Sequence, residues 1–334
     1  MRSLLLSIFC TIAAFGARTL EIHFVDVEGG QATLIVSPAG ESLLVDAGWP
    51  GFNGRDADRI IAAARKAGVN RIDYLVLTHY HRDHAGGVLP LAERFPVINY
   101  VNHGPNTETG KPAEDLSEAY EQAVAKGKRL VVKPGDRIPL KGLDVTVVTA
   151  RGEQIAEPLS GGGGQPNPLC SEARQKPDPS ENARSTGIVV GYGRFRFMDI
   201  GDLTWNKELD LVCPNNRIGK VDVYLTTHHG LNTSGPAGLV HAIAPRVAIM
   251  NNGARKGGSP EAWQIVRKSP GLEDLWQVHF AVAGGSENNT AEAMIANLEE
   301  QCQGHGLSVS AEQDGSFTVI NHRNKFQKRY AAKK

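Results

Sequence analysis

The feature that most constrains the fold of this chain is a run of four metal-ligand side chains within six residues. Residues 79–84 read His-Tyr-His-Arg-Asp-His, an H-x-H-x-D-H pattern. The apolar residues 74–77 directly before it are typical of a buried strand, and Gly86 and Gly87 followed by apolar residues indicate the start of a helix. The pattern therefore predicts a ligand-bearing loop between a strand and a helix.

This ligand set indicates a catalytic metal site. Imidazole and carboxylate groups together suit Zn²⁺ and similar borderline cations, with Mn²⁺ or Fe²⁺ as alternatives. A loop can direct His79 and His81 toward one ion while Asp83 and His84 face another, so we predict two ions. A surface loop that is rich in histidine by chance is the alternative, and four ligands in register behind a buried strand disfavour it.

The composition is that of a soluble globular protein. With 334 residues, 41% hydrophobic and 22% charged, the chain can hold one large domain or two small ones. The 36 basic and 36 acidic residues leave no global field that would gather polyanions. A nucleic-acid partner stays open, but the net charge does not support it.

The first seventeen residues have the pattern of a secretory signal. Arg2 precedes an apolar run at residues 4–15 that ends in small residues. A run of about twelve residues is too short to cross a bilayer, which needs about 20. We therefore predict a signal peptide at residues 1–17, a single domain at 18–334 without a transmembrane anchor, and a secreted or periplasmic location.

The cysteines do not define a framework. Cys170, Cys213 and Cys302 remain after the signal, an odd number without a C-x-x-C pair. One disulfide and three unpaired thiols are both compatible with this count, and the spacing favours no particular pair.

Apolar periodicity predicts alternating strands and helices along the rest of the chain. Strands are expected at residues 21–27, 32–36, 42–45, 72–77, 97–101, 129–132, 143–148, 187–192, 194–200, 221–226, 246–250, 277–282, 307–311 and 316–321. Helices are expected at 56–67, 114–125, 235–243, 259–268 and 290–303. The basic end, residues 323–334, is expected to be a solvated tail.

Residues 152–184 are rich in glycine and proline and show no periodicity. We predict a long loop there. A disordered linker and a lid over the site are the two interpretations, and the sequence does not decide between them.

Ligand-type residues also follow other apolar strands. Asp46, Asp202 and the pair His228 and His229 each come just after a predicted strand. Asp202 is the best candidate for a carboxylate shared by two ions, because Gly201 lets the backbone turn close to the metal. A helix N-cap is the alternative role for Asp202.

Of the two adjacent histidines, only one is expected to bind metal directly, because neighbours at a strand end point in different directions. We predict His228 as the ligand, since it ends its strand in Thr-His as His79 does in the first half. His229 is then expected to act in catalysis or to contact substrate, and the reverse assignment stays open. Two similar halves that donate ligands from their strand ends favour a sandwich of two sheets with helices on both outer faces.

The ligand residues, in this order along the chain, resemble those of the metallo-β-lactamase superfamily. Residues 24–32, 199–203 and 228–234 are more narrowly similar to the ComEC-like metallo-hydrolase subgroup and its secreted relatives, which include phosphorylcholine esterases. The resemblance implies an α+β fold, a four-layer αββα sandwich, and the hydrolysis of esters, amides or phosphodiesters. It also implies that Asp46 holds the ligand loops by hydrogen bonds rather than binding metal.

The chain departs from this pattern in two ways. The superfamily supplies one more histidine to the first metal from the middle of the chain, and residues 148–151 read Val-Thr-Ala-Arg instead. His103 is a candidate substitute, with a plain surface histidine as the alternative. ComEC itself has a run of transmembrane helices that this chain lacks, so DNA transport cannot be inferred from the likeness.

We expect a hydrolase in which two ions lower the pKa of a bridging water from ~16 to about 7 and present hydroxide. The expected ligands of one ion are Asp83, His84, Asp202 and His228, and those of the other are His79 and His81. Asp83 is also expected to orient the hydroxide.

The expected substrate is a phosphodiester or related ester, either a small molecule or a phosphorylated envelope component. Residues 232–234, with Arg184 or Arg255, are candidates to bind its phosphate. Carboxylic esters, lactones and β-lactams are alternatives, and so is a non-catalytic secreted metal-binding protein.

Overall fold

The computed structural model describes residues 19–333, and its first large sheet has nine strands. Neighbours from β3 to β6 run parallel, and the other neighbours run antiparallel. β2 and β3 are buried along their whole length, because the sheet is covered on both faces. The strands, in order across the sheet, are β20 (Gln327–Tyr330), β19 (Phe317–Asn321), β18 (Leu307–Ala311), β1 (Leu20–Phe24), β2 (Thr33–Val36), β3 (Ser42–Val45), β4 (Ile72–Val76), β5 (Val97–Asn102) and β6 (Lys128–Val131).

The second large sheet also has nine strands and a parallel half, which runs from β12 to β17. Its strands, in order, are β17 (Ile295–Asn297), β16 (Asp274–His279), β15 (Val247–Met250), β14 (Val223–Leu225), β12 (Phe195–Asp199), β11 (Gly187–Tyr192), β8 (Asp144–Ala150) and β7 (Arg137–Ile138), with β9 (Glu153–Gln154) paired to β8. A separate small pair joins β10 (Gln165–Pro166) to β13 (Asn215–Asn216).

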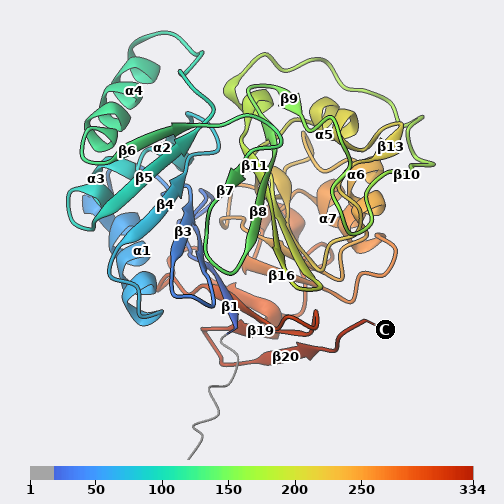
Figure 1. Cartoon of the computed structure of the whole chain (residues 1–334). Coiled ribbons are helices and arrows are strands. Elements are labelled where there is room, and N and C mark those ends of the chain that lie inside the picture. The colour runs from blue at the N-terminus through green and yellow to red at the C-terminus, as the bar shows by residue number, and fades with distance from the viewer. Residues whose placement is uncertain (1–18, 334) are drawn as a thin grey trace, which may run out of the picture.

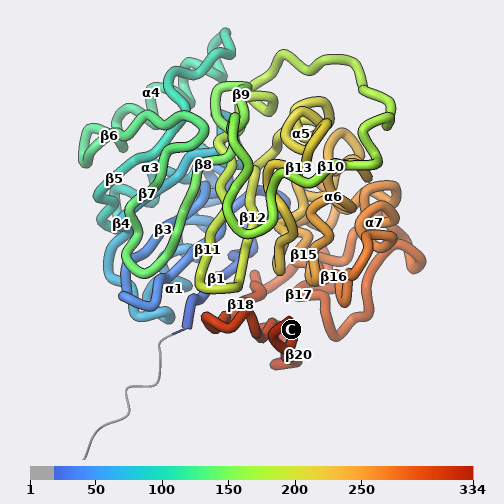
Figure 2. Tube along the Cα trace, turned by 45° about the vertical axis from the view of Figure 1, so that its right-hand side comes forward, coloured from blue at the N-terminus to red at the C-terminus, as the bar shows by residue number. Residues whose placement is uncertain are grey.

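Helices cover the outer face of each sheet. In Figure 1, α1, α3 and α4 lie to the left of the strands of the first sheet and α5, α6 and α7 lie on the right side of the molecule, where Figure 2 shows them again. One apolar core lies between the sheets, and a further core lies under each helical layer. The predicted four-layer αββα sandwich is therefore confirmed. The helices are α1 (Arg55–Lys66), α2 (Arg82–Ala85), α3 (Val88–Ala92), α4 (Lys111–Val124), α5 (Trp205–Val212), α6 (Ala237–Ile243) and α7 (Pro260–Arg267), with short 3₁₀ turns η1 (Phe52–Gly54), η2 (Glu181–Arg184), η3 (Thr227–Gly230), η4 (Val282–Gly284) and η5 (Glu292–Met294).

The predicted helix at residues 290–303 was wrong. Only η5 has helical geometry there, and β17 follows it as a parallel neighbour of β16. The Asn297 side chain donates hydrogen bonds to the carbonyl oxygens of Val278 and His305, at 3.0 and 2.8 Å. Pairing with a sheet edge therefore outweighs the helical spacing of this segment.

The predicted solvated tail was wrong for residues 327–330. β20 pairs with β19, and Tyr330 is buried with its hydroxyl donating to Asp274 Oδ2 at 2.6 Å. The end of the chain therefore extends the first sheet.

The Gly/Pro-rich segment 152–184 contains the short β9, β10 and η2. Cys170 within it forms a disulfide with Cys213, and Cys302 is a free thiol. The predicted signal, residues 1–17, lies outside the described residues. Among residues 19–333, no helix has both the length and the apolar character that spanning a membrane requires.

Candidate metal centre

The candidate ligands come from strand ends that meet at one edge of the sandwich. β4 leads into His79 and α2, β12 leads to Asp202, and β14 leads into η3. Parallel strands place their carboxyl ends at the same edge of a sheet, and the two sheets face each other here. The topology therefore brings together residues that are far apart in the sequence.

Four buried side chains form a compact donor cluster: Asp83, His84, Asp202 and His229. Asp83 Oδ2 lies 3.2 Å from both His84 Nε2 and His229 Nε2. Asp202 contacts the same nitrogens, with Oδ2 at 3.2 Å from His84 and Oδ1 at 3.4 Å from His229. Nitrogen and oxygen ligands about 2.1 Å from a tetrahedral cation lie about 3.4 Å apart, so this spacing suits one divalent ion.

Asp202 lies at the centre of a wider set of imidazoles. Its Oδ2 is also 3.4 Å from His228 Nε2 and 3.9 Å from His79 Nε2. The predicted role as a carboxylate shared by two subsites remains a proposal, and this position fits it. The alternative as a helix N-cap is not seen, since Thr204 occupies that position before α5.

His79 and His81 form a second group of donors beside this cluster. Their ring centroids are 4.5 Å apart, and the His79 ring lies 4.1 Å from that of His84. His79 Nε2 and Asp202 Oδ1 are buried without a hydrogen-bond partner. Buried polar atoms normally have partners, so these orphaned atoms fit a bound cation.

Hydrogen bonds orient two of the imidazoles. Asp46 accepts hydrogen bonds from His84 Nδ1 at 2.6 Å and from the Thr78 hydroxyl at 2.7 Å. Because that hydroxyl donates to Asp46, its oxygen accepts from His79 Nδ1 at 3.0 Å. Both Nε2 atoms therefore face the cluster, as in carboxylate–histidine–metal sites. Asp46 also accepts from the Thr78 backbone N–H at 2.8 Å, which matches the loop-holding role implied by the resemblance.

The local charges keep the carboxylates in the form that binds cations. Burial opposes ionisation of Asp202, but His84 and the neighbouring histidines hold its pKa well below the usual range. Burial also disfavours a charge on His84, yet Asp202 and Asp83 hold the pKa of His84 well above its usual value. Cation binding at these carboxylates is therefore expected to release a proton from His84.

The four-donor cluster contains His229 and not His228, while which of the two binds metal stays a prediction. His229 is buried in the four-donor cluster, whereas His228 contacts Asp202 from the outer side and is 15% exposed. The strand argument fails because β14 ends at Leu225 and both histidines lie in η3 with positive φ, 54° and 56°. A left-handed turn, not strand alternation, decides which ring points inward.

His103 is not brought into the cluster. Its ring is buried, and its Nε2 lies 2.9 Å from Glu181 Oε2. The pairing of His103 with a carboxylate on η2 therefore does not support a role for it in place of the missing mid-chain histidine.

Three of the suggested phosphate-binding residues have other partners. Arg255 pairs with Glu300 at 2.6 Å, Ser234 donates to the Leu203 carbonyl at 2.8 Å, and the Thr233 hydroxyl lies 3.1 Å from His228 Nδ1. Of these residues, Thr233 therefore orients an imidazole of the site.

Sequence reasoning missed Lys256. Its Nζ contacts Asp83 Oδ2 and lies 5.0 Å from the centroid of the Trp49 ring. The following Gly257 has a φ of 77°, and a Cβ there would lie 2.1 Å from the His229 carbonyl oxygen. Two glycines after the lysine, in the loop between β15 and α7, were the available signal for a loop that packs against the site.

Asp26, His279 and Cys302 form another group of donors, but hydrogen bonds account for it. Asp26 accepts from His279 Nε2 at 2.7 Å, from Cys302 Sγ at 3.2 Å and from Arg59 at 3.2 Å. A guanidinium and an imidazole already satisfy this carboxylate.

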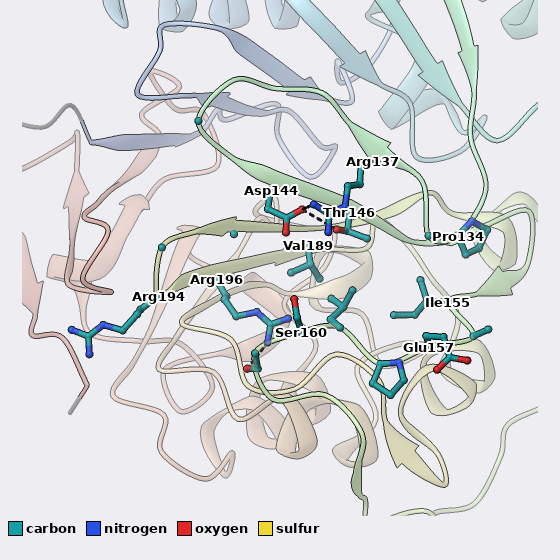
Figure 3. Close-up of a pocket in the computed structure, with 18 residues that line it drawn as sticks. Pro134, Arg137, Asp144, Thr146, Ile155, Glu157, Ser160, Val189, Arg194 and Arg196 are labelled. Atoms are coloured by element: carbon teal, nitrogen blue, oxygen red, sulfur yellow. Dashed lines mark hydrogen bonds and ion pairs between the residues drawn. The ribbon is translucent and has the colours of Figure 1, made fainter.

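The cavity shown in Figure 3, of about 970 Å³, is also separate from the cluster. Arg137 and Asp144 pair there at 3.0 Å, and Arg196 donates to backbone carbonyls. None of the cluster residues lines it.

Known proteins are similar to this chain in sequence. The sequence model of the metallo-beta-lactamase superfamily matches residues 25–165. Recombination protein 2 of Haemophilus influenzae is 25% identical over 237 residues, which cover 70% of this chain and 24% of that protein. ComE operon protein 3 of Bacillus subtilis is 25% identical over 249 residues, which cover 70% of this chain and 28% of that protein.

Among solved structures, the metallo-beta-lactamase fold protein YhfI from Bacillus subtilis is similar, with a TM-score of 0.48 and 12% identity over 78% of this chain and 96% of that one. The chain spans about a quarter of the length of the two curated relatives. The matched sequence, the sandwich and the H-x-H-x-D-H loop agree, and the chain therefore contains a domain of the metallo-beta-lactamase superfamily.

Proposed function

We propose that this protein is a metal-dependent hydrolase of phosphodiesters or related esters. The observation that carries the proposal is the buried cluster in which Asp83 and Asp202 share His84 and His229 at 3.2–3.4 Å. Two ionised carboxylates and two imidazoles in one buried space are the donor set of a divalent cation, not of a packed core.

Each group of donors would hold one cation. Asp83, His84, Asp202 and His229 would hold one, and His79 and His81 would hold the other with Asp202 between them. Bound divalent cations lower the pKa of water and polarise an ester oxygen. Asp83 is the proposed residue to orient the attacking water, because its carboxylate is 10% exposed whereas that of Asp202 is 2% exposed.

Lys256 supports an anionic substrate. Its ammonium group lies at the rim of the cluster on Asp83 and Trp49, and its side chain is 31% exposed. A partly exposed cation beside the donors can bind a phosphoryl oxygen, which a neutral ester does not offer. This favours a phosphodiester over a neutral carboxylic ester or a lactone.

The test is turnover by the purified protein loaded with zinc, manganese or iron(II). We expect hydrolysis of bis-p-nitrophenyl phosphate and a loss of at least about 100-fold in kcat/KM for Asp202→Asn, which keeps the shape but removes the shared charge. Nitrocefin and an acyl-lactone test the alternative substrates. Protein that binds two ions and turns over none of the three would contradict the proposal.

A non-catalytic metal-binding protein is the second candidate. The observation that favours it is the missing mid-chain histidine, together with the capture of His103 by Glu181. Elemental analysis together with the turnover assay separates the two, because two ions per chain with turnover support hydrolysis, whereas bound metal without turnover supports a non-catalytic metal-binding protein.

We also propose that the protein is exported and acts on a phosphorylated envelope component. The N-terminal pattern and the Cys170–Cys213 disulfide support this, since disulfides persist in oxidising compartments. N-terminal sequencing of the protein from fractionated cells tests it, with cleavage near residue 17 as the expected result.

A further inference from the structure

His81, the second histidine of the H-x-H pair, contacts a carboxylate that the ligand pattern does not include. Glu108 lies in the loop between β5 and α4, and its Oε1 is 2.9 Å from His81 Nε2. A carboxylate can only accept, so His81 Nε2 carries the hydrogen and Nδ1 of the neutral ring is left as the free donor atom. This hydrogen bond selects the tautomer of His81.

Glu108 is itself held in place from two sides. Its backbone N–H donates to Asn106 Oδ1 at 3.0 Å, and its Oε1 also accepts the backbone N–H of Glu181 at 3.3 Å. Glu181 is the first residue of η2, at the end of the Gly/Pro-rich segment. The Glu108 carboxylate therefore joins that segment to His81.

Glu181 holds the segment of residues 79–81 through its backbone. Its side chain is fully buried and accepts hydrogen bonds from the Tyr80 N–H at 3.2 Å, from the Thr107 hydroxyl at 2.6 Å and from His103 Nε2 at 2.9 Å. Tyr80 is the residue between His79 and His81. The backbone between the two histidines and the loop that carries Glu108 are thus anchored on one carboxylate.

We propose that Glu108 is a positioning residue for the metal subsite formed by His79 and His81, in which it holds Nδ1 of His81 toward the cation. This inference rests on the proposed function, because it assumes a cation at that subsite. The subsite lacks a third histidine. Its affinity for the cation therefore depends more strongly on the orientation of His81. A carboxylate that accepts a hydrogen bond from a metal-binding histidine typically raises the metal affinity about 10–100-fold.

The experiment is a titration of metal-depleted protein with Zn²⁺ and Co²⁺. Calorimetry measures the binding of both ions, and the visible spectrum reports the bound cobalt. We expect two sites in the wild type, and for Glu108→Ala a loss of about 10–100-fold in affinity at one site with the other unchanged. Glu108→Gln should lose less, because its amide oxygen can still accept from Nε2–H. His84→Ala identifies the other site, and Glu114→Gln on the exposed face of α4 is the matched control.

A second measurement separates positioning from a general effect on folding. Nitrogen-15 NMR of the imidazoles should show His81 as the Nε2–H tautomer in the wild type and as a mixture in Glu108→Ala. The thermal midpoint should stay close to that of the wild type, because the Glu108 side chain is 33% exposed.

The outcomes distinguish this inference from the proposed function. Two sites with unchanged affinities in Glu108→Ala, or equal weakening of both, would overturn the positioning role and leave the hydrolase proposal standing. A wild type that binds one ion only, at the His84 site, would do the same. A wild type that binds no metal would overturn both.

Discussion

Adjacent residues at the site have different environments although both are histidines. His229 reaches both carboxylates of the cluster and is fully buried, whereas His228 is partly exposed and lies 3.1 Å from the Thr233 hydroxyl. Burial among carboxylates is the environment of a ligand, and an exposed ring with a hydroxyl partner suits contact with substrate.

This difference predicts unequal effects of two matched substitutions. His229→Ala should remove one of the two metal equivalents, because it deletes a donor from the four-residue cluster. His228→Ala should keep both equivalents and raise KM more than it lowers kcat. Elemental analysis and steady-state kinetics measure these effects, and loss of metal from His228→Ala alone would show that the placement of the two rings is misassigned.

At the scale of elements, the ligand loop is held by a close approach of two backbones. The Ala47 N–H donates to the His84 carbonyl at 2.9 Å, and the Gly87 N–H donates to the Gly48 carbonyl at 3.0 Å. A Cβ on Gly87 would lie 1.9 Å from the Ala47 carbonyl oxygen, so the segments after β3 and α2 touch because this residue has no side chain.

Gly87→Ala should therefore push α2 away from β3 and disturb Asp83 and His84. We expect a destabilisation of about 1–3 kcal/mol, the range for overpacking, together with weaker metal binding. Gly191→Ala is the control, because a Cβ there meets its nearest atom at 3.6 Å. Urea midpoints and metal content measure the effect, and a Gly87 variant that behaves like the Gly191 variant would contradict this account of the loop.

At the scale of the whole molecule, acid sensitivity is expected from two histidines where β1, α1 and the turn after β19 meet. Burial, followed by the charges of His322 and Lys66, lowers the pKa of His23 to about 4. Burial, followed by Lys66 and Lys325, lowers the pKa of His322 to about 4. Both rings are therefore neutral in the folded protein at pH values where they are protonated in the unfolded chain.

The sign of the pH effect follows from this difference. The unfolded state binds more protons between pH 6.5 and pH 4, so the stability is fully present above pH 6.5 and is lost as the pH falls through about 4. Thermal midpoints of metal-free protein across this range should fall with pH, and His23→Gln combined with His322→Gln should flatten the slope. A double variant that keeps the wild-type slope would assign the acid sensitivity to other groups.

Much of the fold and most of the residues that meet at the site could be predicted from local sequence. The strand before His79, the ligand spacing of residues 79–84 and the position of Asp202 after a glycine all depend on neighbours along the chain. The prediction of a helix at 290–303 was wrong because the conformation of this segment depends on pairing with a partner strand, β16, and not on its own periodicity.

The sequence by itself determined that a buried strand delivers an H-x-H-x-D-H loop to one edge of a two-sheet sandwich, because apolar period and ligand spacing are local properties. Only the tertiary structure decided that His229 and not His228 enters the cluster, that Glu181 captures His103, and that Cys170 pairs with Cys213. These choices depend on the left-handed turn in η3 and on contacts between residues 43 to 146 positions apart, which no local pattern encodes.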